Sequence, residues 1–213
     1  MSISAVIFDF GGVILTSPFE AFARYETDNG LPTGFIRRLN ATNPDSNAWA
    51  RLERSEVDLD GFVALFEAEA TSAGHSVDGR IILAMLAGEL RPEMVEALRR
   101  CHERLGTALL TNNFTLGDSN GNADGEPSGP MATVLREFDV IVESSQVGLR
   151  KPDPAIYRLV CDKLGIEPSE AVFLDDLGIN LKPARAMGMT TIKVIDPHDA
   201  LADLEAVVGF PLR

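Results

Sequence analysis

The hydrophobic residues of this chain follow two different spacings, and the first is an unbroken run. Ala5-Val6-Ile7-Phe8 is continuously apolar, ends at Asp9, and is followed by Gly11 and Gly12. Runs of this kind are typical of strands buried on both faces of a parallel sheet. The pattern predicts further strands near residues 107–111, 138–142, 171–174 and 190–195.

The second spacing, of three and four residues, fills the stretch from residue 17 to residue 88. It predicts helices around Phe19, Phe35 and Phe62, with Asp58 as an N-cap, and breakers such as Gly30-Leu31-Pro32 separate them. No convincing strand pattern occurs in this stretch. We therefore predict a helical subdomain at 17–88, inserted after the first strand.

Helices and strands alternate after residue 89. Helices are expected from Pro92 to about residue 104, up to about Leu164, from 181 to 187 before Gly188, and at 200–207. This alternation predicts an α/β fold with a parallel sheet flanked by helices, made from residues 1–16 and 89–213.

Residues 117–129 are rich in glycine and polar residues and lack apolar periodicity. They are interpreted as a surface loop, with a ligand-gating lid as the alternative.

Composition narrows the classes of partner. The chain has 213 residues and a formal net charge of -13, which argues against nucleic acid as a partner. An anionic substrate would have to be held by local cations against this field. Cys101 and Cys161 are the only cysteines, and we expect both to be free thiols in a reducing compartment. No apolar run approaches the ~20 residues that span a membrane, and no leader is visible, so we expect a cytoplasmic protein without a membrane partner.

Reactive polar residues follow three of the predicted strands. Asp9, Thr111-Asn112 and Asp175-Asp176 stand at strand ends, and Lys151 begins a helical segment. The carboxyl ends of parallel strands meet at one edge of a sheet, so these side chains are expected to gather there. The set suits phosphoryl transfer to a carboxylate, with Asp9 as the nucleophile.

A magnesium site fits the same residues. Asp9, Asp176 and a backbone carbonyl at Gly11 would supply oxygen ligands for Mg²⁺. Lys151 and the Thr111 hydroxyl would hold the phosphoryl oxygens in the transition state. Asp175 is either a second metal ligand or a residue that orients another ligand or Lys151.

Four motifs resemble those of the haloacid dehalogenase superfamily of aspartate-nucleophile phosphatases. They are Asp9-Phe10-Gly11-Gly12-Val13, Leu110-Thr111-Asn112, Lys151-Pro152 and Phe173-Leu174-Asp175-Asp176, in the family's order. The likeness extends to the phosphatase domain of soluble epoxide hydrolases and a related domain of acyl-CoA dehydrogenase family members. We expect no epoxide hydrolase activity.

This resemblance implies a Rossmann-like core with a helical cap, dependence on Mg²⁺, and hydrolysis of a small phosphorylated metabolite. It also implies that Thr111, Asn112 and Lys151 bind the substrate. Asn180 stands where many relatives carry a further acidic residue, so it is a candidate orienting residue or alternative metal ligand.

Gly11 departs from the family pattern. Most of the family's phosphatases carry a second aspartate there as general acid and base, which is typically worth ~10²–10⁴-fold in rate. Slow turnover, proton transfer by another group or water, or a substrate with a good leaving group would each account for the change. A 2-haloacid dehalogenase and a non-catalytic phosphate-binding protein are the competing functions. The identity of the substrate and the oligomeric state stay open at this stage.

Overall fold

The computed structural model describes residues 2–86, 88–112 and 129–213 of the chain. Its sheet has the strand order β3-β2-β1-β4-β5, and every neighbouring pair is parallel. The predicted α/β architecture with a Rossmann-like parallel sheet is confirmed. The strands are β1 (Ala5–Phe8), β2 (Gly106–Thr111), β3 (Val140–Glu143), β4 (Ala171–Asp175) and β5 (Thr190–Lys193).

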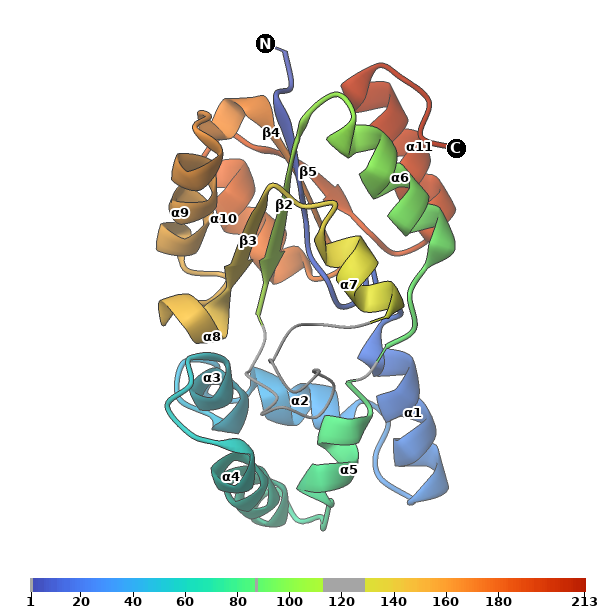
Figure 1. Cartoon of the computed structure of the whole chain (residues 1–213). Coiled ribbons are helices and arrows are strands. Elements are labelled where there is room, and N and C mark those ends of the chain that lie inside the picture. The colour runs from blue at the N-terminus through green and yellow to red at the C-terminus, as the bar shows by residue number, and fades with distance from the viewer. Residues whose placement is uncertain (1, 87, 113–128) are drawn as a thin grey trace.

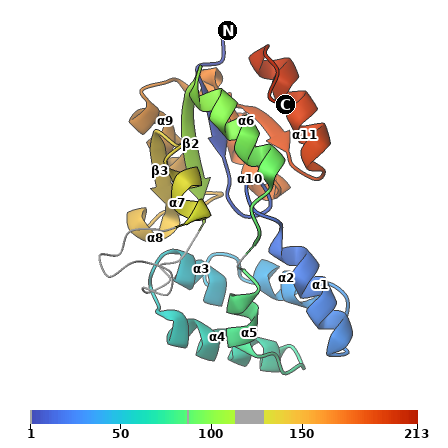
Figure 2. The ribbon, with the colours of Figure 1, turned by 45° about the vertical axis from the view of Figure 1, so that its right-hand side comes forward.

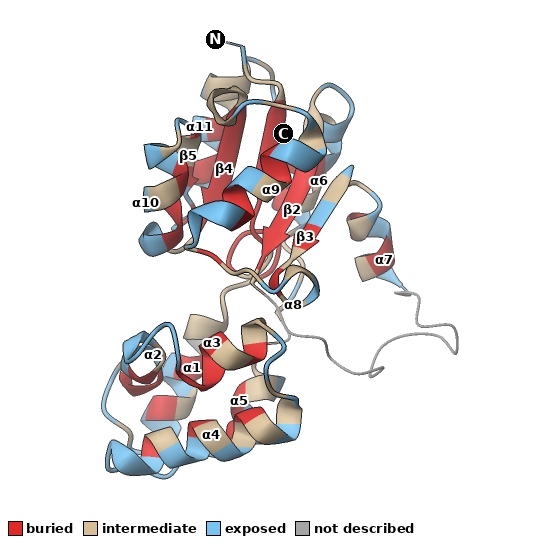
Figure 3. Ribbon diagram, turned by 90° about the vertical axis from the view of Figure 1, so that its left-hand side faces the viewer, coloured by how far each residue is buried: buried red, intermediate tan, exposed pale blue. Residues whose placement is uncertain are grey.

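Helices cover both faces of this sheet (Figure 1). One face packs against α6 (Pro92–His102), α7 (Pro130–Leu135) and α11 (Pro197–Val208). The other packs against α9 (Pro154–Leu164) and α10 (Gly178–Ala186). Side chains of successive strand residues point to opposite faces, so in β1 Val6 and Phe8 join the first core and Ile7 the second. This double burial is why the central strands β1, β2 and β4 are nearly continuous apolar runs and are buried along almost their whole length (Figure 3), whereas the edge strands β3 and β5 are partly exposed.

Five helices between β1 and α6 form a separate layer beyond the carboxyl edge of the sheet (Figures 1 and 2). They have their own hydrophobic cluster, in which the ring of Trp49 lies 4.7 Å from that of Phe62. Asp58 caps the fourth of them by accepting a hydrogen bond from the Gly61 N–H, as predicted. The helices are α1 (Pro18–Asp28), α2 (Phe35–Ala41), α3 (Ala48–Glu53), α4 (Leu59–Ser72) and α5 (Gly79–Ala84).

The two connections between the sheet and this helical layer run side by side. Leu15 bridges Leu90, the Thr16 N–H donates to the Glu89 carbonyl, and the Arg91 N–H donates to the Ile14 carbonyl. We propose that residues 17–88 act as a cap on the core formed by 1–16 and 89–213, with these paired connections as its base. Helices α1 to α5 are called the cap below.

Three details differ from the sequence expectation. β3 begins at Val140 instead of residue 138, because the Phe138 N–H donates to the Leu135 carbonyl in the turn that ends α7. α10 begins at Gly178 instead of residue 181, because the Asp175 carboxylate accepts the Leu177 N–H and starts the turn early. The short helices α3, α5, α7 and α8 (Ser144–Val147) gave no separate periodicity, and a single 3-10 turn, Pro168–Glu170, precedes β4.

Other expectations concern particular segments. Cys101 and Cys161 are both free and buried, as expected. Almost all of the glycine-rich stretch at 117–129 lies outside the described residues, so its interpretation as a loop or lid stays a prediction. Among the helices that the structure describes, none combines the length and apolar character needed to cross a membrane.

Candidate active site

Asp9 is fixed at the end of the central strand. Its backbone N–H donates to the Leu174 carbonyl at 2.9 Å, which extends the pairing of β1 with β4 by one residue. Its carboxylate Oδ1 accepts the Phe10 N–H at 2.7 Å and lies 2.8 Å from Nζ of Lys151. The residue is only 7% exposed. The backbone of the sheet therefore sets both the place and the orientation of the predicted nucleophile.

Lys151 is the buried cation of the site. Its Nζ also donates to Oδ2 of Asp175 at 2.8 Å, and the residue is 1% exposed. Asn112 holds the backbone of Lys151 from the core side, accepting its N–H at 2.8 Å and donating to its carbonyl at 3.0 Å. The side-chain amide of Asn112, predicted to bind substrate, is thus engaged in placing Lys151. Thr111, 5% exposed, is the last residue of β2 and lies next to Asn112.

Asp175 is fully buried, and both of its carboxylate oxygens accept hydrogen bonds. Its two carboxylate oxygens accept hydrogen bonds from the Asn180 amide at 3.1 and 3.0 Å, and its Oδ1 accepts the Leu177 N–H at 2.7 Å. Asn180 is in turn fixed because the Tyr157 hydroxyl donates to its carbonyl at 2.7 Å. The sequence left two roles open for Asp175 and Asn180, to orient Lys151 or to bind a metal. This geometry favours the orienting role.

Asp176 completes a cluster of three carboxylates. Asp9, Asp175 and Asp176 each offer an oxygen within 4.8 Å of the others. Asp176 is less buried than the other two, and its Oδ2 accepts a hydrogen bond from the Ser17 hydroxyl at 3.4 Å. Ser17 is the N-cap of α1, so the cap begins at the site itself.

The electrostatics of the cluster leave it short of positive charge. Burial, together with the charges of Asp175 and Asp176, raises the pKa of Asp9 well above 3.8 in spite of Lys151. Burial and the charge of Asp175 raise the pKa of Asp176 to about 6. Burial opposes the charge of Lys151, but Asp175 and Asp9 outweigh it and raise the pKa of the ammonium. The two carboxylate pKa shifts follow from placing like charges together in a desolvated site, and the lysine pKa shift follows from the opposite charges around it.

The donor set fits a hard divalent cation. Within the described part of the chain, Lys151 is the only base that forms an ion pair with any of the three carboxylates. Three ionised carboxylates and one ammonium leave two negative charges, which is the charge that Mg²⁺ would neutralise. Carboxylate and carbonyl oxygens are the ligands that Mg²⁺ prefers.

A protein-family model also matches most of the chain. The model for haloacid dehalogenase-like hydrolases matches residues 3–188. The chain belongs to this family.

Curated relatives include proteins much longer than this chain and a phosphatase that the chain covers almost completely. The chain is 39% identical over its whole length to acyl-CoA dehydrogenase family member 10 of Mus musculus, and covers 20% of that protein. It is 34% identical over its whole length to bifunctional epoxide hydrolase 2 of Sus scrofa, covering 40% of it. It is 29% identical to phosphatase MT3486 of Mycobacterium tuberculosis, with 89% of this chain and 86% of that protein covered. The chain thus spans less than half the length of the first two relatives.

Solved structures of the family share the fold. The HAD family enzyme BT-2542 of Bacteroides thetaiotaomicron, solved with magnesium and inorganic phosphate, has a TM-score of 0.60 at 20% identity, covering 90% of this chain and 94% of that one. The L-2-haloacid dehalogenase of Xanthobacter autotrophicus, with chloropropionic acid covalently bound, has a TM-score of 0.57 at 19% identity, covering 96% and 82%. At these identities the likeness concerns the fold alone.

Two contacts at this haloacid dehalogenase-like site gave no signal in the sequence. Ser17 follows a strand-to-helix turn and reads as an ordinary N-cap, so its bond to Asp176 was not predictable. Gly12 adopts φ +78°, and an added Cβ would overlap the Asp176 carboxylate, lying 2.5 Å from its Cγ. The glycine is therefore needed for close approach of the two motifs.

We expect Gly12→Ala to lower both the melting temperature and the activity, because the left-handed φ costs about 1–2 kcal/mol and Asp176 must move. Gly11→Ala is the matched control: residue 11 has an ordinary φ, and an added Cβ meets nothing within 4 Å. Thermal melts and Mg²⁺ titrations of both variants are the measurement. Equal effects of the two substitutions would contradict the role given to Gly12.

Proposed function

We propose that this protein is a Mg²⁺-dependent phosphatase of a small phosphorylated metabolite, with Asp9 as the nucleophile. The observation that carries the proposal is the buried cluster of three carboxylates around a single lysine at the carboxyl edge of the sheet. Asp9, Asp176 and the Gly11 carbonyl would hold the ion. When bound, Mg²⁺ would offset the repulsion between the Asp9 carboxylate and the phosphate and stabilise the charge of the transition state.

The residues of the chain account for the two chemical steps. In the first, a carboxylate oxygen of Asp9 attacks phosphorus, the bond to the ester oxygen breaks, and the alcohol leaves with a proton taken from solvent or substrate. In the second, water attacks phosphorus of the aspartyl phosphate, which releases inorganic phosphate and restores the Asp9 carboxylate. Lys151 and the Thr111 hydroxyl would stabilise the phosphoryl oxygens in both steps.

Proton transfer to the leaving group is the weak point of this site. Position 11 carries no side chain, so the general acid that relatives use is absent there. Substrates whose leaving group needs little protonation should therefore be hydrolysed best.

Gly11→Asp should raise kcat on alkyl and sugar phosphates by up to about 10²-fold, and much less on p-nitrophenyl phosphate. The backbone permits the change, because residue 11 has an ordinary φ and open space at its Cβ. Rates on both classes of substrate, measured beside Gly11→Asn, check the prediction. Gly11→Asn fills the same space without supplying a proton. A folded Gly11→Asp variant that shows no selective gain over Gly11→Asn would mean that protonation is not limiting.

A 2-haloacid dehalogenase is the second candidate, and Gly11 is the observation that favours it. In that reaction the Asp9 carboxylate would displace halide from carbon, and no acid is needed for a halide leaving group. The surplus of negative charge at Asp175 and Asp176 disfavours an anionic haloacid unless a cation is bound.

A paired assay separates the two candidates. Phosphate release from a panel of phosphorylated metabolites and chloride release from 2-chloropropionate are measured with Mg²⁺ and with EDTA. The proposal expects phosphate release that depends on Mg²⁺ and no chloride release. Chloride release that is indifferent to EDTA, with no phosphate release, would replace the phosphatase by the dehalogenase.

A further inference from the structure

An ion pair between the cap and the core plays no part in the chemistry described above. Glu53, the last residue of α3, has its Oε2 2.6 Å from Nη2 of Arg150 in the core. The Glu53 and Arg150 side chains are only 15% and 21% exposed. Nη1 of Arg150 also donates to the Pro44 carbonyl at 2.7 Å. A single core side chain therefore contacts the cap both at the end of α3 and in the loop that precedes it.

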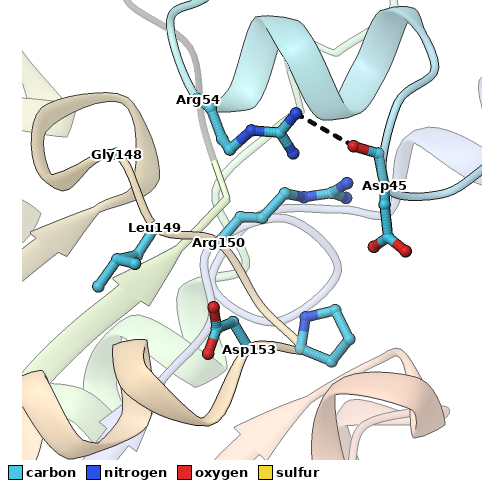
Figure 4. Close-up of a pocket in the computed structure, with 7 residues that line it drawn as sticks. Asp45, Arg54, Gly148, Leu149, Arg150 and Asp153 are labelled. Atoms are coloured by element: carbon cyan, nitrogen blue, oxygen red, sulfur yellow. Dashed lines mark hydrogen bonds between the residues drawn. The ribbon is translucent and has the colours of Figure 1, made fainter.

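Arg150 directly precedes Lys151 in the chain, and the two side chains go to different parts of the molecule. The Lys151 ammonium binds Asp9 and Asp175 in the core, and Asn112 holds the Lys151 backbone from the same side. The Arg150 guanidinium extends toward the cap residues Asp45 and Arg54 (Figure 4). A displacement of α3 that carries Arg150 with it would therefore reach the backbone of Lys151.

The backbone on either side of α3 is strained. Asn43 has φ 49° and Ser55 has φ 57°, and among the described residues these are the only non-glycine positions with positive φ. The Ser55 hydroxyl donates to the Ser145 carbonyl of the core at 3.1 Å. Strained conformations persist where the surroundings impose them, and they cluster at functional sites. The position of α3 is thus imposed in part by its contact with the core.

The contact between α3 and the core is incompletely packed and incompletely hydrogen-bonded. Nε of Arg150 is buried without a hydrogen-bond partner, and Oε2 of Glu53, although it lies 2.6 Å from Nη2 of Arg150, accepts no hydrogen bond of good geometry. A cavity of about 360 Å³ lies beside Arg150, lined by Asp45 and Arg54 of the cap and by Leu149, Arg150 and Asp153 of the core (Figure 4). An unsatisfied buried donor disfavours this contact, and the attraction between Glu53 and Arg150 offsets that cost.

Glu53 is also close enough to the site to be affected by its charges. Burial raises the pKa of Glu53, while the charges of Arg150 and then Lys151 favour the ionised form. The Glu53–Arg150 pair therefore lies between the cap and Lys151, the residue that would bind phosphate.

We propose that Glu53 and Arg150 are positioning residues. Their ion pair holds Lys151 in place, and it can do so only while α3 is docked on the core. Docking of the cap and placement of the phosphate-binding ammonium are then a single event. The inference rests on the proposed phosphatase function, because Lys151 acts through that chemistry.

The first test compares Glu53→Gln with Glu56→Gln. Glu56 lies in the same cap and pairs with Arg54, but its side chain is 46% exposed, so it is a matched control. With p-nitrophenyl phosphate and Mg²⁺, Glu53→Gln should lower kcat about ten- to a hundredfold and change KM less, because a misplaced group loses transition-state stabilisation. Glu56→Gln should remain near wild type.

A double-mutant cycle separates positioning from loss of stability. If the pair acts as a unit, Glu53→Gln/Arg150→Gln should be no slower than the slower single variant, whereas independent effects would multiply. Hydrogen–deuterium exchange of residues 148–153 should become faster in Glu53→Gln but not in Glu56→Gln, a readout that does not require activity.

Three results are decisive. The inference would be overturned if Glu53→Gln kept the wild-type kcat and the wild-type hydrogen–deuterium exchange rate. It would also be overturned if the losses of kcat multiplied in the double variant. Both results would leave the phosphatase proposal in place. An absence of phosphate release by the wild-type chain on every substrate would overturn the phosphatase proposal. In that case, faster hydrogen–deuterium exchange of residues 148–153 in Glu53→Gln alone would still support the coupling of α3 to the loop that carries Lys151. Unchanged exchange would overturn this coupling.

Discussion

Asp9→Asn is expected to reduce phosphate release by at least about 10⁴-fold while the protein stays folded, because the amide is nearly isosteric but a far poorer nucleophile. The melting temperature should not fall. The substitution removes one of three clustered carboxylates, and Lys151 keeps its partner Asp175. Steady-state rates recorded with Mg²⁺ and thermal melts recorded without it are the measurements.

Asp162→Asn is the matched control for this change. Asp162 lies on the exposed side of α9, away from the cluster, so its variant should keep the wild-type rate. Wild-type activity in a purified Asp9→Asn protein would remove Asp9 from the role of nucleophile.

Lys151→Met should have the second largest effect, and it should act on both rate and stability. The loss of one charge that stabilises the phosphoryl oxygens is expected to lower kcat about 10²–10³-fold. Asp9 and Asp175 lose the ammonium that lies 2.8 Å from each. Removing one partner of a buried ion pair typically lowers the free energy of unfolding by about 3–5 kcal/mol.

A second substitution distinguishes the two effects of Lys151→Met. Adding Asp175→Asn removes the buried charge left unpaired, so the melting temperature should partly recover while the activity should not. Lys182→Met, at an exposed position of α10, should change neither quantity. Recovery of activity together with stability would show that Lys151 contributes to the fold alone.

The existence of the strands and their parallel direction were predictable, because the central strands are buried on both sides, whereas the strand order was not predicted. Ala5 to Phe8 and Ala171 to Leu174 are apolar at every position, since their side chains point alternately into two hydrophobic layers. A strand with one solvated face would have shown alternation instead. The same logic placed Asp9, Thr111 and Asp176 at one edge, because parallel strands end together.

Contacts between distant segments were beyond the sequence. The pairing of Glu53 with Arg150 joins a helix of six residues, too short for its own periodicity, to a loop nearly a hundred positions away. The engagement of Asn112 with the Lys151 backbone also depends on how β2 and the lysine loop pack, which no local pattern encodes. Sequence analysis therefore missed the Glu53–Arg150 pair and assigned Asn112 differently, although it offered an orienting role for Asp175 and Asn180.

The most direct test of the central claim is to trap the covalent intermediate. The wild-type protein is mixed with p-nitrophenyl phosphate and Mg²⁺, quenched in acid within one turnover, and digested for peptide mass spectrometry. The account predicts a phosphoryl group on Asp9, absent with EDTA and absent in Asp9→Asn. Phosphate release without a phosphorylated Asp9, or a phosphoryl group on another residue, would contradict it.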